Sequence, residues 1–184
     1  MTSFMITVVV ALSLFPRVLQ EKPQEKQQEK ASCPMHERDK ASQDHRHHEG
    51  VVERGDQVMG FSHEKSVHHF RLYADGGAIE AEANDAQDAA SGDAIRTHFG
   101  HIAAMFAAGD FSAPMLIHEQ NPPGTEEMKR RREAIQYSVE NTERGARIRI
   151  TAKSPEAIQA VHKFLRFQIA DHQTGDGTEV TKAP

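Results

Sequence analysis

A pattern of two strands followed by a helix occurs twice in this chain and constrains its fold more than any other feature. In the first unit, apolar and polar residues alternate over residues 67–73 and 78–83, and a helical pattern follows at 93–106. In the second unit, the alternating segments lie within residues 135–150, and the helical pattern covers residues 154–172. Period-two alternation predicts half-buried strands, and apolar residues spaced by three and four predict an amphipathic helix.

The two units together predict an α+β fold. Each helix has one apolar stripe to bury against a sheet face, so we expect a four- or five-stranded antiparallel sheet with two helices on one face. Residues 113–120 are predicted to be a further strand, either at an edge of the sheet or with Pro114 at its start, because Pro114 cannot donate to a ladder. The single domain is predicted to span residues 58–175. The other face of such a sheet is open to solvent, to a protein partner or to a second copy in a homodimer.

Composition divides the rest of the chain into tails. Only 38% of the 184 residues are hydrophobic, and residues 20–57 contribute most of the shortfall. Residues 20–57 are predicted to be a disordered polar linker, so that the folded domain is preceded by a disordered N-terminal arm. Residues 176–184 are predicted to be a disordered tail. The formal net charge of −5 supplies no positive field for nucleic acid, so no nucleic-acid partner is expected.

Residues 1–19 contain an apolar run at 4–15, which has the length of a signal-peptide core and is short for a membrane span. We expect a signal peptide or, if it is not cleaved, an N-terminal anchor. The protein is therefore predicted to be periplasmic or extracellular, with membrane contact only through this segment.

The polar linker concentrates metal-binding side chains. A thiolate, a thioether and an imidazole lie within the run Cys33-Pro-Met-His36, and a cluster of histidines follows. These groups suit Cu(I) or Zn²⁺. The run resembles the core of the heavy-metal-binding modules of copper export systems, which implies copper binding. The candidate ligands here are Cys33, Met35, His36, His45, His47 and His48.

The first predicted helix carries a second set of candidate ligands. His98, His101 and Met105 lie side by side along one flank, next to the apolar stripe that contains Phe99 and Ile102. Imidazole and thioether groups bind copper, so this flank is a candidate copper or zinc site. The alternative interpretation is that these side chains pack at the edge of the helix.

Two further histidines, His68 and His118, are predicted on the core-facing sides of their strands. If the first helix crosses those strands, His68 and His118 converge with the histidines of its flank in a mononuclear metal site. The alternative is that His68 and His118 are buried, hydrogen-bonded histidines. For His162, on the apolar side of the second helix, this structural interpretation is the main one.

Enzyme motifs are absent from the sequence. The chain has no zincin His-Glu-x-x-His, no Gly-x-Ser-x-Gly and no phosphate- or dinucleotide-binding glycine loop. The folded half is similar to a group of small exported bacterial proteins of uncharacterised function. Some of those carry an aspartate carbamoyltransferase label, but the Ser-Thr-Arg-Thr phosphate segment of that enzyme is missing here. This resemblance implies a shared fold and export.

The sequence thus supports three functional hypotheses. The first is an exported, non-catalytic protein that binds copper, or zinc, for sequestration or handover. The second is a structural or protein-interaction module that uses the open sheet face. The third is a small enzyme with a histidine-lined pocket, and finding such a pocket would raise its standing.

Overall fold

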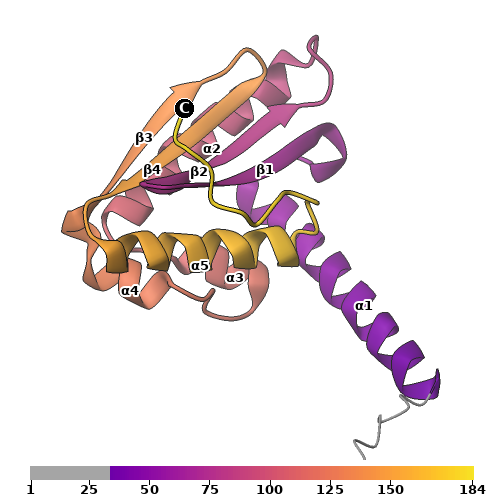
Figure 1. The fold of residues 1–184 in the computed structure, drawn as a ribbon. Coiled ribbons are helices and arrows are strands. Elements are labelled where there is room, and N and C mark those ends of the chain that lie inside the picture. Colours follow the sequence, from indigo (N-terminus) through magenta and orange to yellow (C-terminus); the bar gives the residue numbers. More distant parts are fainter. Residues whose placement is uncertain (1–33) are drawn as a thin grey trace, which may run out of the picture. The chain divides into compact units, whose positions relative to one another are not determined.

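The protein's structure, a computed structural model, describes residues 34–184, with side chains described from residue 42. This part contains five α-helices, two short 3₁₀ helices and four strands (Figure 1). In chain order they are α1 (Pro34–Met59), η1 (His63–Lys65), β1 (Ser66–Tyr73), β2 (Gly76–Ala83), α2 (Ala89–Ala107), α3 (Ser112–His118), α4 (Thr125–Arg130), η2 (Arg132–Ala134), β3 (Ile135–Asn141), β4 (Gly145–Ala152) and α5 (Pro155–Asp171).

The four strands form one antiparallel sheet in the order β1-β2-β4-β3. Phe70 lies opposite Ile79, which lies opposite Ile148, so one row of apolar side chains crosses three strands on the same face. The α+β fold and the repeated strand-strand-helix unit are confirmed. Strand β2 of the first hairpin pairs with strand β4 of the second, so the two units meet at the middle of the sheet.

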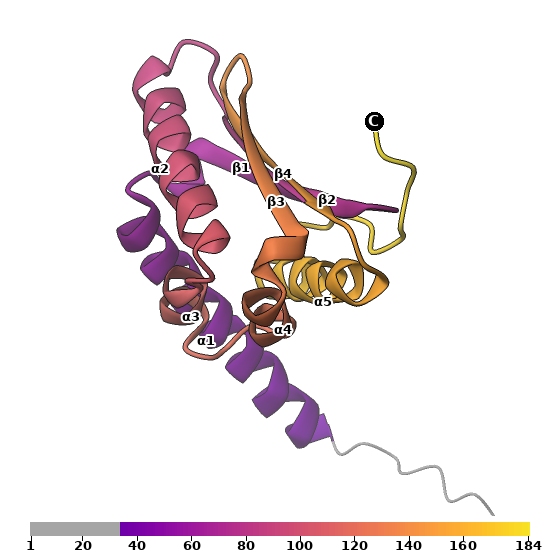
Figure 2. The ribbon, with the colours of Figure 1, turned by 90° about the vertical axis from the view of Figure 1, so that its left-hand side faces the viewer.

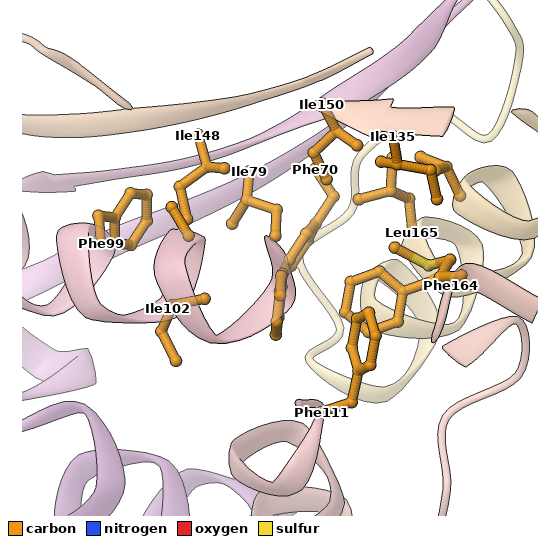
Figure 3. Close-up of a cluster of buried hydrophobic side chains, with 14 of the residues drawn as sticks. Phe70, Ile79, Phe99, Ile102, Phe111, Ile135, Ile148, Ile150, Phe164 and Leu165 are labelled. Carbon is orange, nitrogen blue, oxygen red and sulfur yellow. The ribbon is translucent and has the colours of Figure 1, made fainter. Parts of the chain in front are cut away.

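The core lies between this sheet face and the helices α2 and α5 (Figure 2). Phe99 of α2 points toward the isoleucines of β2 and β4, Phe164 and Leu165 of α5 belong to the same cluster, and Ile102 extends from α2 on the side away from the sheet (Figure 3). Burying an aliphatic or aromatic side chain of this size stabilises the fold by about 1.5–3 kcal/mol. Both predicted helices therefore pack on one face of the sheet, as expected.

A glycine lets α5 approach the sheet closely. A Cβ atom at Gly77 would lie 2.2 Å from Cδ1 of Leu165 and 2.4 Å from the carbonyl oxygen of Arg71. Only glycine fits between the strand and the helix at this position. The Asp-Gly-Gly turn signal thus marks a packing contact as well as a hairpin.

The predicted strand at 113–120 is wrong, because the chain forms the short helix α3 there. Pro114 lies in the first turn of this helix, where its missing N–H group costs nothing, and Asp110 accepts a hydrogen bond from the backbone N–H of Ser112 at 2.9 Å. As a result, Ile117 and His118 are buried and Leu116 is exposed, whereas strand alternation had placed Leu116 and His118 on the same face.

The linker prediction is also wrong from Pro34 onward, because residues 34–59 form α1. Val51 and Gly55, which are buried, share a helical stripe with the partly buried Val58. The guanidinium Nε of Arg54 donates to the carbonyl oxygen of Ile117 at 2.8 Å, which ties α1 to α3. Residues 20–33 of the predicted linker lie outside the described residues, as does the predicted signal peptide or anchor at 1–19.

The tail predicted to be disordered at 176–184 lies along the free edge of β1. Thr181 pairs with Tyr73 in a parallel bridge, and its backbone N–H donates to the carbonyl oxygen of Leu72 at 2.9 Å. The Asp176 carboxylate accepts hydrogen bonds from the backbone N–H of Phe70 and from the side chains of His69 and Arg71, each at 2.9 Å. This segment therefore protects one edge of the sheet.

Both long core helices begin at a side-chain cap. Ser154 caps α5 by accepting from the backbone N–H of Ala157. For α2 the cap is Asp88, which accepts from the N–H and hydroxyl of Ser91. In the part of the chain that the structure describes, no helix has the length and apolar character needed to cross a membrane.

Candidate functional site

A cavity of about 70 Å³ lies between the inner face of the sheet and the helices α2, α3 and α5. Eleven of its sixteen lining residues are apolar, among them Phe70, Phe99 and Phe164. Its polar lining residues are His68, His98, His118, Gln168 and His172. No charged side chain is among them, so the cavity is an apolar space with a few polar groups, as small-molecule sites are.

His118 is the most firmly held of the four histidines. It ends α3 with its side chain fully buried, its Nδ1 lies 2.5 Å from a carboxylate oxygen of Asp171, and its Nε2 lies 3.0 Å from Oε1 of Gln168. A carboxylate accepts hydrogen bonds, so Nδ1 carries a proton. Since both ring nitrogens are engaged, His118 offers no free nitrogen to the cavity.

Asp171 joins three helices behind the cavity wall. One carboxylate oxygen accepts from His118 of α3, the other accepts from Nε2 of His47 in α1 at 2.9 Å, and its carbonyl oxygen accepts from Nδ1 of His48 at 3.3 Å. Burial alone would raise the pKa of Asp171, but the hydrogen bonds from His118 and His47 hold it below its usual range.

The other three histidines, His68, His98 and His172, are held by ring packing. His172 meets the ring of His118 edge-on at 4.9 Å and stacks on that of His68 at 6.2 Å, measured between centroids. The His98 and His68 rings pack against Phe61 at 5.7 and 5.6 Å. Within residues 34–184, none of these three rings makes a hydrogen bond with another protein group.

These three histidines are uncharged at neutral pH. Burial is the main cause and the neighbouring histidines add to it: the pKa of His68 and that of His98 fall to about 4, and that of His172 falls to about 3. A neutral imidazole has one N–H donor and one nitrogen acceptor. The cavity wall therefore carries three uncharged rings whose hydrogen-bonding groups have no protein partner.

Gln168 adds a further unpaired group. This residue is 4% exposed, and its Nε2 has no hydrogen-bond partner in the described chain while its Oε1 lies 3.0 Å from Nε2 of His118. If the amide were turned round, Nε2 would donate to a neutral His118 and the carbonyl oxygen would be the unpaired atom. In either orientation one amide group is unsatisfied, which costs about 1–3 kcal/mol unless a bound molecule or water satisfies it.

A groove of about 270 Å³ lies beside the cavity, between α1, α2 and α3. It is lined by the predicted flank His98, His101 and Met105, together with Val58 and Leu116 and three smaller or buried residues. The prediction that these three side chains share one flank is thus confirmed. His98 lines both the groove and the cavity.

The predicted metal ligands do not gather at one place. His68, His98 and His118 line the cavity, His101 and Met105 line only the groove, and in α1 His45 pairs with Glu49 while His47 and His48 contact Asp171. Among the described residues, no three side chains of His, Cys, Asp or Glu lie close enough to hold a metal ion.

The linker set reaches beyond the described chain. Cys33 lies outside the described residues, and Met35 and His36 lie in the first turn of α1, where side chains are not described. His162, by contrast, has the structural role that was its main interpretation: its buried Nε2 lies 2.9 Å from the carbonyl oxygen of Tyr73 and 3.0 Å from that of Gly76.

Sequence reasoning missed Gln168, Asp171 and His172. The signal was present, because Gln168 lies three residues after Leu165 on the apolar stripe of α5, where a polar side chain needs a buried partner. His172 lies three residues after Ile169 on the same side. The pairing of Asp171 with His118 was not readable, since it depends on α3 being a helix.

Comparison of this chain with known protein families, with curated proteins and with solved structures finds no match.

Proposed function

We propose that this protein binds a small uncharged molecule, about the size of a single ring, in the histidine-lined cavity. The observation that carries this proposal is the polar part of an otherwise apolar wall: the buried, unpaired amide group of Gln168 and three neutral, partly exposed imidazoles that have no hydrogen-bond partner in the described chain. Buried polar groups are almost always paired in folded proteins, so an unpaired amide beside three imidazoles that can still form hydrogen bonds favours a bound partner.

The chemistry of the wall defines the ligand. Because no carboxylate, lysine or arginine side chain lines the cavity, a charged ligand would lose its hydration without gaining an opposite charge. The aromatic side chains suit a flat apolar ring, and the neutral histidines suit a hydroxyl or N–H group on that ring. Phenols and small azoles have this combination.

Binding is favoured over catalysis at this site. A general base works best when its pKa lies near the working pH, whereas the pKa of His68 and that of His98 are about 4 and that of His172 is about 3. His118 has a carboxylate partner like that of a catalytic histidine, but Gln168 occupies its second nitrogen.

Two probes of equal size test this proposal. Fluorine NMR with para-fluorophenol and para-fluorotoluene compares a ring that hydrogen-bonds with one that does not. One hydrogen bond contributes about 0.5–1.5 kcal/mol, so we expect the phenol to bind roughly threefold to tenfold more tightly. His172→Phe should remove this preference, while the surface variant His45→Ala should keep it. A cavity that takes neither probe, and so holds only water, would contradict the proposal.

We further propose copper handling outside the cytoplasm as a second candidate function. The observation that favours it is the shared groove of His98, His101 and Met105, since two imidazoles and a thioether form a ligand set suited to Cu(I). The linker ligands from Cys33 to His48 would provide a separate capture site, and handover would involve a protein partner.

Titration of Cu(I) under anaerobic conditions, in competition with a chromogenic chelator, tests this second candidate. We expect Met105→Leu to remove the groove site and Cys33→Ser to remove the linker site, each with the loss of one bound copper. Binding that both variants leave intact, or an affinity no higher than that of a histidine-matched peptide, would refute copper handling.

A further inference from the structure

The cavity and the groove share part of their walls. His98, Ile102 and Ala113 line both hollows, so these three side chains form the wall that the cavity and the groove share. Movement of any of the three would widen the passage between the two hollows.

His98 is the side chain best able to move. Its imidazole makes no hydrogen bond within the described chain, and it packs against the rings of Phe61, at 5.7 Å, and Phe99, at 6.3 Å. Ile102 belongs to the buried stripe of α2 and is 9% exposed, and the methyl group of Ala113 has no alternative rotamer. Turning His98 therefore breaks packing contacts but no hydrogen bond.

The groove is suited to guide an uncharged molecule toward His98. Leu116 of α3 is 58% exposed at its rim, and Met105 and Val58 line the same hollow. Exposed apolar side chains beside an apolar cavity provide a path on which an uncharged ring keeps favourable contacts. None of the residues that line the groove carries a carboxylate or a guanidinium group.

We propose that His98 is the gate between the groove and the cavity, and that the uncharged ligand passes it when the imidazole turns aside. This inference rests on the proposed ligand-binding function and adds the access route. In the closed position, the same ring presents its nitrogens to the bound molecule. His98 is thus a positioning residue that sets the rate of exchange.

Exchange kinetics test the gate. Association and dissociation rates of para-fluorophenol are measured by fluorine NMR in the full chain. We expect His98→Ala to raise both rates at least about tenfold while the dissociation constant changes much less, because removing a gate lowers the barrier in both directions. His45→Ala is the control: His45 is exposed on α1 and lines neither the groove nor the cavity, so its loss should leave both rates unchanged.

A second variant covers the case in which His98→Ala does not fold. Leu116→Trp adds bulk at an exposed rim position and should slow both rates without weakening binding. If the wild-type chain binds no para-fluorophenol, the ligand-binding function itself fails. If it binds and both variants exchange as the wild type does, access lies elsewhere, for example beside His172, and the gate is refuted.

Discussion

The polar side chains on the two sides of the sheet differ in charge and in whether they are paired. On the outer face, the Glu80 carboxylate bridges Arg147 at 2.7 Å and Arg71 at 3.7 Å, and Glu82 pairs with Arg144 at 2.7 Å. On the inner side, the cavity is lined by His68 of β1, His98 of α2 and His172 just after α5, whose imidazoles have no hydrogen-bond partner in the described chain. The outer face is charged and paired, and the cavity is uncharged and unpaired.

This difference indicates where a ligand can form the most new hydrogen bonds. A partner at the outer face would have to replace ion pairs that the protein already makes, whereas a molecule in the cavity could bond to the unpaired amide of Gln168 and to imidazoles that have no protein partner. The prediction that the open sheet face serves a protein partner or a homodimer stays a prediction.

Acid should have the largest effect, and it should act through the inner face. Unfolded histidines titrate near pH 6.5, whereas the pKa of His68 and that of His98 are about 4 in the folded protein. Between these values the unfolded state binds more protons, so stability falls as pH falls, by up to about 1.4 kcal/mol per pH unit for each histidine. Urea unfolding at a series of pH values measures this slope.

A variant assigns the acid effect to the cavity. His172→Phe, which removes a histidine with a pKa of about 3, should flatten the slope, and His45→Ala on the exposed side of α1 should not. Equal slopes for all three proteins would mean that the acid response arises outside the cavity.

Loss of the carboxylate behind the cavity should have the next largest effect. Asp171→Asn replaces the charged hydrogen-bond acceptor of the fully buried His118 by a neutral amide and weakens the contact with His47, so we expect a loss of about 3 kcal/mol in the free energy of unfolding. Asp93→Asn breaks an exposed pair with Arg96 and should change stability by less than about 0.5 kcal/mol. Urea titrations of both variants check the difference, and a similar small loss in each would refute the proposed junction.

Asp176 holds the C-terminal segment to the edge between the two faces and should have an intermediate effect. Asp176→Asn weakens charge-assisted hydrogen bonds to His69, Arg71 and the backbone N–H of Phe70, which should lower stability by about 1.5–3 kcal/mol. Hydrogen exchange should become faster at the N–H of Thr181. Unchanged protection there would show that Asp176 does not anchor the tail.

The outer face should show the smallest effect. Glu80→Gln removes one member of a network whose two arginines, Arg71 and Arg147, are each about a third or more exposed, and ion pairs at the surface contribute about 0.2–1 kcal/mol. Salt should reduce the difference between the variant and the wild type, because exposed charges are screened. A loss as large as that of Asp171→Asn would show that the outer face is a structural centre of the molecule.

The sequence predicted the sheet and its two core helices because their signals are local. Alternation in β1 placed His68, Phe70 and Leu72 on one face, as the structure confirms, and Ser154 followed by Pro155 marked the start of α5. The periodic apolar pattern is dictated by burial, so it survives whatever the neighbouring elements do.

The missed elements depend on contacts between distant segments. A proline in an apolar stretch fits an edge strand or the first turn of a helix, and for Pro114 the packing of Ile117 and His118 decided for α3. The polar helix α1 has only a narrow buried stripe around Val51, so composition alone predicted a linker. The one large apolar residue of the tail, Val180, is exposed, and the tail is held by Asp176, whose partners lie more than 100 residues earlier.

For the same reason, only part of the candidate site could be predicted from the sequence. His68, His98 and His118 were singled out by their residue type, and the structure brings them to one cavity. Their role as metal ligands stays a prediction. The groups that complete the cavity, Gln168 and His172, come from the end of α5, and no local pattern connects that end to β1.

The most direct test of the ligand-binding account is the imidazole nitrogen spectrum of the folded protein at neutral pH, recorded with and without para-fluorophenol. We expect neutral rings at His68 and His172 and a shift of at least one of their nitrogens on binding, while the nitrogens of His162, already bonded to backbone carbonyl groups, stay unchanged. Spectra in which the cavity histidines do not respond to the probe, or respond no more than His162, would contradict the account.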